Sequence, residues 1–157
     1  MMKKPGLRAW HVPVRLATGA FILNSGIQKL SQADDERRKQ IHGLAANAYP
    51  AFEKIDPATF VTALGAGEAA LGAALLVPFV SSGVAGLGLT AFSGGLAGLY
   101  LRTPSMREHG SLRPSPQGLA VSKDVWMLGI GTGLVIDAVV ERFRRTGRRI
   151  RSGVRSR

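Results

Sequence analysis

The chain contains no cysteine, and its 10 acidic residues are outnumbered by 21 lysines and arginines. The absence of cysteine excludes disulfides, thiolate metal sites, cysteine-ligated iron–sulfur clusters and thiol redox chemistry within this chain. The three histidines, His11, His42 and His109, fall in separate segments, so we predict no haem or metal site and assign no catalytic residue. Any redox role therefore needs a bound cofactor or a partner.

Charge is almost missing from residues 60–101, where Glu68 is the only charged side chain. Two runs of roughly 20 apolar or small residues match the length that two helices need to cross ~30 Å of hydrocarbon. Residues 60–80 and 83–101 are therefore predicted to form a membrane hairpin, with its polar turn at 81–83. A carboxylate inside such a span is costly to bury, which makes Glu68 a candidate functional residue.

Two flanking segments, 12–30 and 125–141, are predicted to complete a set of four spans. Each is close to the lower length limit for a span and contains ionisable residues. The predicted fold is thus all-α, a four-helix transmembrane bundle over residues 1–143. The remainder, 144–157, is predicted to be a basic cytoplasmic tail.

The first long loop, residues 31–59, carries the signature of a short helix. Asp34, Asp35 and Glu36 suit a helix start, and an apolar stripe follows them. We predict that this helix lies on the outer surface of the membrane. The second long loop, 102–123, is rich in proline and is predicted to be irregular.

Basic residues indicate the orientation of the four spans in the membrane. The side that holds both termini carries eleven lysines and arginines, and the side with the two long loops carries eight. Positive charge concentrates on the cytoplasmic side, so we predict cytoplasmic termini in a multi-pass protein of a bacterial plasma membrane.

Pairs of glycines suggest where helices cross closely. Gly94 and Gly98 form one GxxxG pair, and Gly129 and Gly133 form another. Such pairs allow the backbones of membrane helices to approach each other. Both packing within the bundle and an interface with a partner remain open as their role.

Four short motifs in the predicted spans resemble the DoxX family of small four-span bacterial membrane proteins. In chain order they are Arg15-Leu-Ala-Thr-Gly19, Gly26-Ile-Gln-Lys29-Leu30, Gly65-Ala-Gly-Glu68 with Leu71-Gly72, and Ser122-Lys123-Asp124. The resemblance implies a four-helix membrane bundle associated with redox enzymes. It suggests an accessory subunit or anchor of a membrane redox complex, or alternatively a subunit that interacts with quinone itself. The basic tail and the long first loop depart from the usual family pattern.

Depth along the spans brings several polar residues to one level. At ~1.5 Å per residue, Glu68 lies roughly 12 Å below the outer edge of its span. Similar counts place five further candidates near it, namely Asn24, Ser25, Lys29, Ser93 and Thr132. We predict either a pocket around Glu68 for a quinone headgroup or another amphipathic ligand, or polar contacts that only join the helices. Lys29 is placed to reach either Glu68 or the outer interface.

Two other groups of charges receive roles from their position. Arg15 and Asp137 lie at comparable depth near the cytoplasmic side and are predicted to form a structural ion pair, with a proton or anion path as the alternative. The tail arginines are predicted to bind anionic lipids, or alternatively an acidic partner. Nucleic acid is not the expected partner, since no recognition fold for it accompanies the arginines. The arginines assigned to lipid are Arg144, Arg145, Arg148, Arg149 and Arg151.

Overall fold

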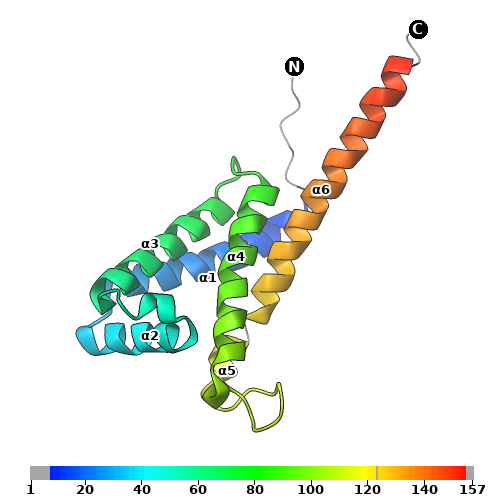
Figure 1. The fold of residues 1–157 in the computed structure, drawn as a ribbon. Helices are drawn as coiled ribbons and strands as arrows, with labels where there is room; N and C mark the ends of the chain where they lie inside the picture. The colour runs from blue at the N-terminus through cyan, green and yellow to red at the C-terminus, as the bar shows by residue number, and fades with distance from the viewer. Residues whose placement is uncertain (1–7, 123, 155–157) are drawn as a thin grey trace.

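The computed structural model describes residues 8–122 and 124–154, with side chains described up to residue 147. Within these residues the fold is all-helical, as predicted, and the only pairing of extended chain is an isolated bridge between Arg107 and Pro114. Figure 1 shows the elements in chain order: α1 His11–Ser31, α2 Asp35–Ala48, η1 Pro50–Phe52, α3 Pro57–Leu76, α4 Ser82–Arg102, η2 Pro104–Met106, α5 Leu119–Ser122 and α6 Val125–Val154.

Side-chain caps and prolines set the bounds of the central helices. The Asp56 carboxylate accepts the backbone N–H of Thr59 at 3.0 Å and so caps the start of α3. The end of α3 corrects the predicted span of 60–80, because the helix stops at Leu76. Pro78 disfavours helical geometry at the residue before it and cannot donate a backbone hydrogen bond. Ser81 then caps α4 through the N–H of Val84.

The short helix predicted in the first loop forms as α2. Its cap is Asp34, which accepts the backbone N–H of Arg37 at 2.8 Å. The far end of α2 is tied to α4, since the Tyr49 hydroxyl donates to the Gly95 carbonyl at 2.8 Å. These contacts hold α2 across one end of the helix bundle (Figure 1).

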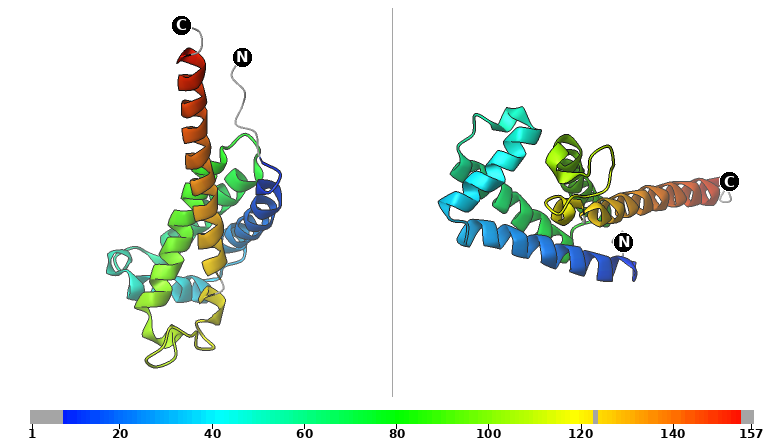
Figure 2. Two further views of the ribbon diagram at one scale, coloured as in Figure 1. Left: turned by 90° about the vertical axis from the view of Figure 1, so that its right-hand side faces the viewer. Right: turned by 90° about the horizontal axis from the view of Figure 1, so that it is seen from below.

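Three helical segments are long and apolar enough to cross a membrane. They are α3, α4 and residues 119–147, which run through α5 into α6. The last helix continues to Val154 and extends beyond the other helices, as Figure 2 shows. The predicted boundary between bundle and tail at 143 therefore falls inside one helix.

Glycines bring the helices together in two close pairs, α1 with α3 and α4 with α6. A Cβ atom placed on Gly26 of α1 would lie 2.5 Å from the backbone nitrogen of Ala69, and one on Gly72 of α3 would lie 2.5 Å from that of Leu23. In the second pair, a Cβ on Gly131 would lie 2.7 Å from the nitrogen of Thr90. Only glycine permits backbones this close at these positions.

The predicted GxxxG pairs are not the ones that mediate these crossings. A Cβ on Gly94, Gly129 or Gly133 would meet nothing within 4 Å, and Gly98 faces the Tyr49 side chain. The prediction of close helix crossing at these glycines is therefore wrong for contacts within the described chain. The GxxxG spacing is present in the sequence, but the spacing does not say which side of a helix faces its neighbour.

The two helix pairs meet through a compact apolar core. Its fully buried members come from both pairs: Ile22, Leu75, Ala85, Leu89, Met127 and Leu134. This core fills the seam between the pairs over its middle part. Toward the end that α2 covers, the pairs separate and leave a cavity between them.

Candidate functional site

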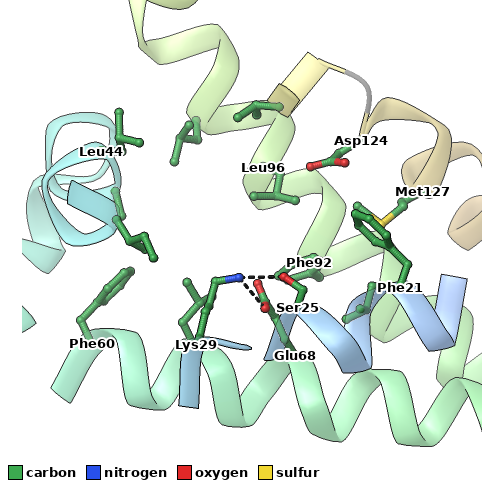
Figure 3. A pocket seen from close by; sticks show the side chains of 16 residues that line it. Phe21, Ser25, Lys29, Leu44, Phe60, Glu68, Phe92, Leu96, Asp124 and Met127 are labelled. Carbon is green, nitrogen blue, oxygen red and sulfur yellow. Dashed lines mark hydrogen bonds and ion pairs between the residues drawn. The ribbon is translucent and has the colours of Figure 1, made fainter. Parts of the chain in front are cut away.

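The cavity has a volume of about 240 Å³ and is bounded by α1, α2, α3, α4, α5 and the start of α6. Most of its walls are apolar (Figure 3). The apolar lining residues are Phe21, Ile22, Ile41, Leu44, Ala45, Phe60, Leu64, Phe92, Leu96, Leu99, Val121 and Met127. An apolar enclosure with a few polar groups is the usual form of a small-molecule site.

Helical periodicity places the polar groups of this pocket beside its aromatic walls. On α1, Phe21, Ser25 and Lys29 follow one another at intervals of four residues and so share a face. On α3, Phe60 and Glu68 share a face in the same way. Each helix therefore contributes an aromatic ring and an ionisable group to one cavity.

An ion pair between Lys29 and Glu68 forms the polar side of the pocket. The Lys29 Nζ donates to Glu68 Oε2 at 2.7 Å and to Ser25 Oγ at 2.8 Å (Figure 3). Its side chain turns toward the N-terminal end of α1, which is the usual direction for long side chains in helices. The missing side chain of Gly65 lets α1 approach closely here, because a Cβ there would lie 3.0 Å from Cβ of Lys29.

Asp124 supplies a third ionisable group from the opposite wall. It precedes α6, and Figure 3 shows its carboxylate on the pocket side of the chain near Leu96. Among the described lining residues, two carboxylates thus face one ammonium. A ligand here can accept a hydrogen bond from the ammonium of Lys29 and donate hydrogen bonds to carboxylate oxygens.

Three of the six predicted pocket residues line the cavity, namely Ser25, Lys29 and Glu68, and three do not. Asn24 is exposed, because it lies about 100° around α1 from Ser25. The hydroxyls of Ser93 and Thr132 donate to the carbonyls of Leu89 and Leu128, one turn earlier in their own helices. The six residues predicted at one level in four spans are thus reduced to three that line the pocket, which come from α1 and α3 alone.

Sequence reasoning missed the aromatic walls and gave Asp124 no place in the pocket. Phe21, Phe92 and Met127 carry no motif of their own. A signal was nevertheless present, since Phe21 and Phe60 stand eight residues before Lys29 and Glu68. This interval places each phenylalanine on the side of its own helix that carries the ionisable residue.

The structure corrects the predicted ion pair between Arg15 and Asp137. Among the described residues, Arg15 contacts no carboxylate. Asp137 instead pairs with Arg8 and lies 3.2 Å from His11 Nε2. Matching depth along the spans was not sufficient, because backbone carbonyls at the end of α3 lie within reach of the Arg15 guanidinium.

Arg15 is only 3% exposed, and its guanidinium satisfies the end of α3. The Nε group donates to the Leu75 carbonyl at 2.7 Å, and Nη2 donates to those of Ala74 and Val77 at 2.9 Å each. The remaining donor group, Nη1, contacts the carbonyl of Val80 and the hydroxyl of Ser82. A cation suits this position, because the last carbonyls of a helix lack intrahelical partners and carry partial negative charge.

The tail arginines are only partly described. Arg144 and Arg145 are exposed on α6, and Arg145 pairs with Glu141 at 2.9 Å. The side chains of Arg148, Arg149 and Arg151 lie outside the described residues. Lipid binding by this group stays a prediction.

Comparison of the chain with protein-family models, with curated proteins and with solved structures finds no match. What the pocket can bind is therefore inferred from its own residues.

Proposed function

We propose that this chain is a four-span membrane protein of the DoxX type, whose pocket between the helix pairs binds the headgroup of a quinone. In this proposal it serves a redox complex of a bacterial plasma membrane as an accessory subunit. The observation that carries the proposal is the apolar cavity with Lys29, Glu68 and Asp124 on its walls.

Three helical segments are long and apolar enough to cross a membrane. The packing of α1 supports its assignment as the fourth span. The 21 residues of α1 reach ~31 Å, enough to cross the hydrocarbon beside α3. Its two ionisable residues in the span do not face lipid, since Arg15 binds backbone carbonyls and Lys29 binds Glu68. Internal partners reduce the cost of such residues in a membrane.

The orientation with cytoplasmic termini can be tested independently of any ligand. Ser111→Cys places a thiol in the second long loop, and Thr146→Cys places one beyond the last span. Because the chain has no native cysteine, each variant carries a single thiol. In intact cells, an impermeant thiol reagent should label the first and not the second. The opposite labelling pattern would reverse the orientation.

The chemistry of the pocket suits a quinone in both of its redox forms. The carbonyl oxygens of the oxidised form can accept a hydrogen bond from Lys29, and the hydroxyls of the reduced form can donate to Glu68 or Asp124. Phe21, Phe60 and Phe92 offer surfaces against which a flat ring can pack. The cavity is smaller than the ~300–1,000 Å³ typical of sites for drug-sized ligands, so it suits a single substituted ring.

The role of an accessory subunit follows from what the chain does not supply. Without cysteine it provides no thiol or cysteine-ligated cluster, so electrons would pass to or from the quinone through a partner. The alternative is a subunit that is itself part of the quinone-reactive centre, and it is favoured by the two carboxylates of the pocket, Glu68 and Asp124, which could exchange protons with a bound quinone. Purification in a mild detergent, followed by identification of bound proteins and extracted quinone, separates the two roles.

Quinone retention by point variants tests the pocket itself. Lys29→Met and Glu68→Gln should each lower the amount of quinone that co-purifies or rebinds, because each removes a charge on the wall of the pocket. Asn24→Ala is a matched control, since Asn24 neighbours the pocket residue Ser25 in sequence but lies outside the pocket. Equal retention in all three folded variants and in the wild type would refute the pocket.

A further inference from the structure

A second hollow adjoins the pocket at the corner between the end of α1 and the start of α2. Its volume is about 340 Å³. Three of its lining residues, Ser25, Lys29 and Ile41, also line the pocket. The others are Gln28, Gln32, Ala33 and Arg37. We call this hollow the vestibule.

The vestibule and the pocket differ in character although they share a wall. Gln28, Gln32 and Arg37 are exposed, so the vestibule opens to the surroundings of the protein. Its amide and guanidinium groups offer hydrogen bonds to water, whereas the pocket is walled largely by aromatic and aliphatic side chains. Ser25 and Lys29 therefore stand at the boundary between a polar space and an apolar one.

The vestibule has room for several water molecules. One water occupies about 30 Å³ of the liquid and needs two to four polar partners, which the glutamines, Ser25 and Arg37 provide. Lys29 itself carries three N–H donors, and two of them are used by Ser25 and Glu68. The Lys29 side chain is 19% exposed against 5% for Glu68, so the lysine is the more accessible member of the pair.

We propose that the vestibule is a water-filled entrance that keeps the Lys29–Glu68 pair in proton equilibrium with the aqueous phase on the α2 side. That the pocket holds a ligand rests on the proposed function, but the water entrance does not. The ionisable groups around Lys29 are Arg37 from α2, Glu68 from α3 and Asp124 before α6, and α4 contributes none among the described lining residues.

In the opposite direction, buried apolar side chains separate the pocket from a third hollow of about 440 Å³ at the far end, which Ser82 and Asp137 line. Beyond the pocket lies the core between the helix pairs, where Ile22, Leu75, Leu89, Met127 and Leu134 are at most 1% exposed. At the far end, the donors of Arg15 are already bonded. A change in the protonation of a pocket ligand would therefore be balanced from one side of the membrane.

Single cysteines test the entrance directly. Ser25→Cys places a thiol on the shared wall, Gln32→Cys places one in the vestibule, and Asn24→Cys places one at the same depth outside both cavities. With the protein in lipid nanodiscs, a charged methanethiosulfonate reagent should modify Ser25→Cys, since only a hydrated thiolate reacts quickly with it. Gln32→Cys gives the rate of a freely accessible site.

A plug then shows whether the reagent enters through the vestibule. Ala33→Trp adds a large side chain to the vestibule wall, away from the pocket. In combination with Ser25→Cys it should slow labelling by about tenfold or more, because the thiolate loses its water and its access. An unreactive Ser25→Cys, or one that the plug leaves equally fast, would overturn the proposal.

Asn24→Cys keeps this outcome separate from that of the proposed function. Fast labelling at position 24 would contradict the membrane placement of α1, while the effect of the plug on Ser25→Cys would still decide the entrance. Conversely, a protein that never retains quinone would refute the pocket ligand and leave the labelling result unchanged.

The side of proton access can be measured with the same variant. In proteoliposomes of uniform orientation, the membrane-permeable reagent N-ethylmaleimide reacts with Ser25→Cys in proportion to its thiolate fraction. The rate should rise roughly tenfold per pH unit on the α2 side, below the pKa of the thiol, and should not follow pH on the other side. A rate that follows the pH of the other compartment would overturn the proposal.

Discussion

The two cations inside the helix bundle, Arg15 and Lys29, both belong to α1 but are held in different ways. Arg15 has its donors occupied by four carbonyls and one hydroxyl, and its own side chain lines none of the three cavities found among the described residues. Lys29 has one carboxylate and one hydroxyl as partners and lines two cavities. A buried charge with all its donors bonded has none left for a ligand, whereas one beside open space is available to a ligand.

The residue types match these two tasks. The guanidinium of arginine is planar, always charged and offers five donors in a fixed geometry, which suits a fixed set of carbonyls. The ammonium of lysine is a compact group on a flexible chain, and it changes its charge more readily when buried. Replacement of Arg15 by lysine and of Lys29 by arginine would therefore change the stability of the two ends of the bundle by different amounts.

Arg15→Leu should have the largest effect on stability. It leaves the last carbonyls of α3 without partners and removes the link between α3 and α4. We expect a loss of about 3–5 kcal/mol in the unfolding free energy, because several buried carbonyls each lose a hydrogen bond to a charged donor, worth about 1.5–3 kcal/mol. Denaturant unfolding in detergent measures it.

Arg15→Lys serves as the control for charge, since it keeps the cation but offers only three donors. It should recover part of the loss. Wild-type stability of Arg15→Leu would mean that the carbonyls need no cation, and the contrast between the two ends would fail.

Gly26→Ala should come next, because both cations require α1 to lie close to α3. The added Cβ would collide with backbone atoms of Ala69 and Gly65, at 2.5 and 2.6 Å, so the helices must separate. Overpacking of this kind costs about 1–3 kcal/mol. Gly129→Ala is the matched control, as its Cβ meets nothing within 4 Å. Comparable losses in the two variants would show that helix contact is not the cause.

The Lys29–Glu68 pair should contribute less to stability than Arg15 does. Glu68→Leu leaves the ammonium unpaired, but Lys29 lies two residues from the end of α1 and can turn outward to polar surroundings. The double variant Lys29→Met with Glu68→Leu should be about as stable as the wild type while it retains no quinone. A double-mutant cycle in thermal unfolding gives the coupling. If the double variant were as unstable as Arg15→Leu, Lys29 would stabilise the fold as strongly as Arg15 does.

Asp56→Ala should have the smallest effect, and one that depends on pH. The backbone N–H of Thr59 donates to the carboxylate and holds the pKa of Asp56 below its ordinary value of 3.8. A lowered pKa means that the ionised form stabilises the fold above this value and that the contribution is lost as pH falls through the lowered pKa. Thermal unfolding should therefore separate Asp56→Ala from the wild type near neutral pH and bring the two together in acid. A stability gap that persists in strong acid would show that Asp56 stabilises the fold without its negative charge.

The sequence allowed prediction of the helices but not of the sides on which they meet. Apolar runs located α3 and α4, and Asp34 marked the start of α2, because these signals are local. The contacts of Arg15 could not be foreseen, since backbone carbonyls carry no residue-type signal. Depth is also only one coordinate of a helix, so Asn24 and Ser25 received the same role although they face different ways.

One feature of the site was within reach of sequence reasoning. Long side chains in a helix lean toward its N-terminus, so a lysine near the end of α1 is directed back into the bundle. Applied to Lys29, this rule favours the contact with Glu68 over the outer interface. The rule also fits Arg15, whose side chain leans toward the end where α3 stops.

The helix α6 is longer than a membrane span requires. Its 30 residues measure ~45 Å, while the hydrocarbon of a bilayer is ~30 Å thick. In the four-span arrangement, about 15 Å of unbroken helix would stand clear of the hydrocarbon. A soluble enzyme bound to those last turns would be held at a fixed distance from the bilayer and in a fixed orientation. Each residue inserted into this part of α6 would move the bound enzyme ~1.5 Å along the helix axis and rotate it ~100° about that axis.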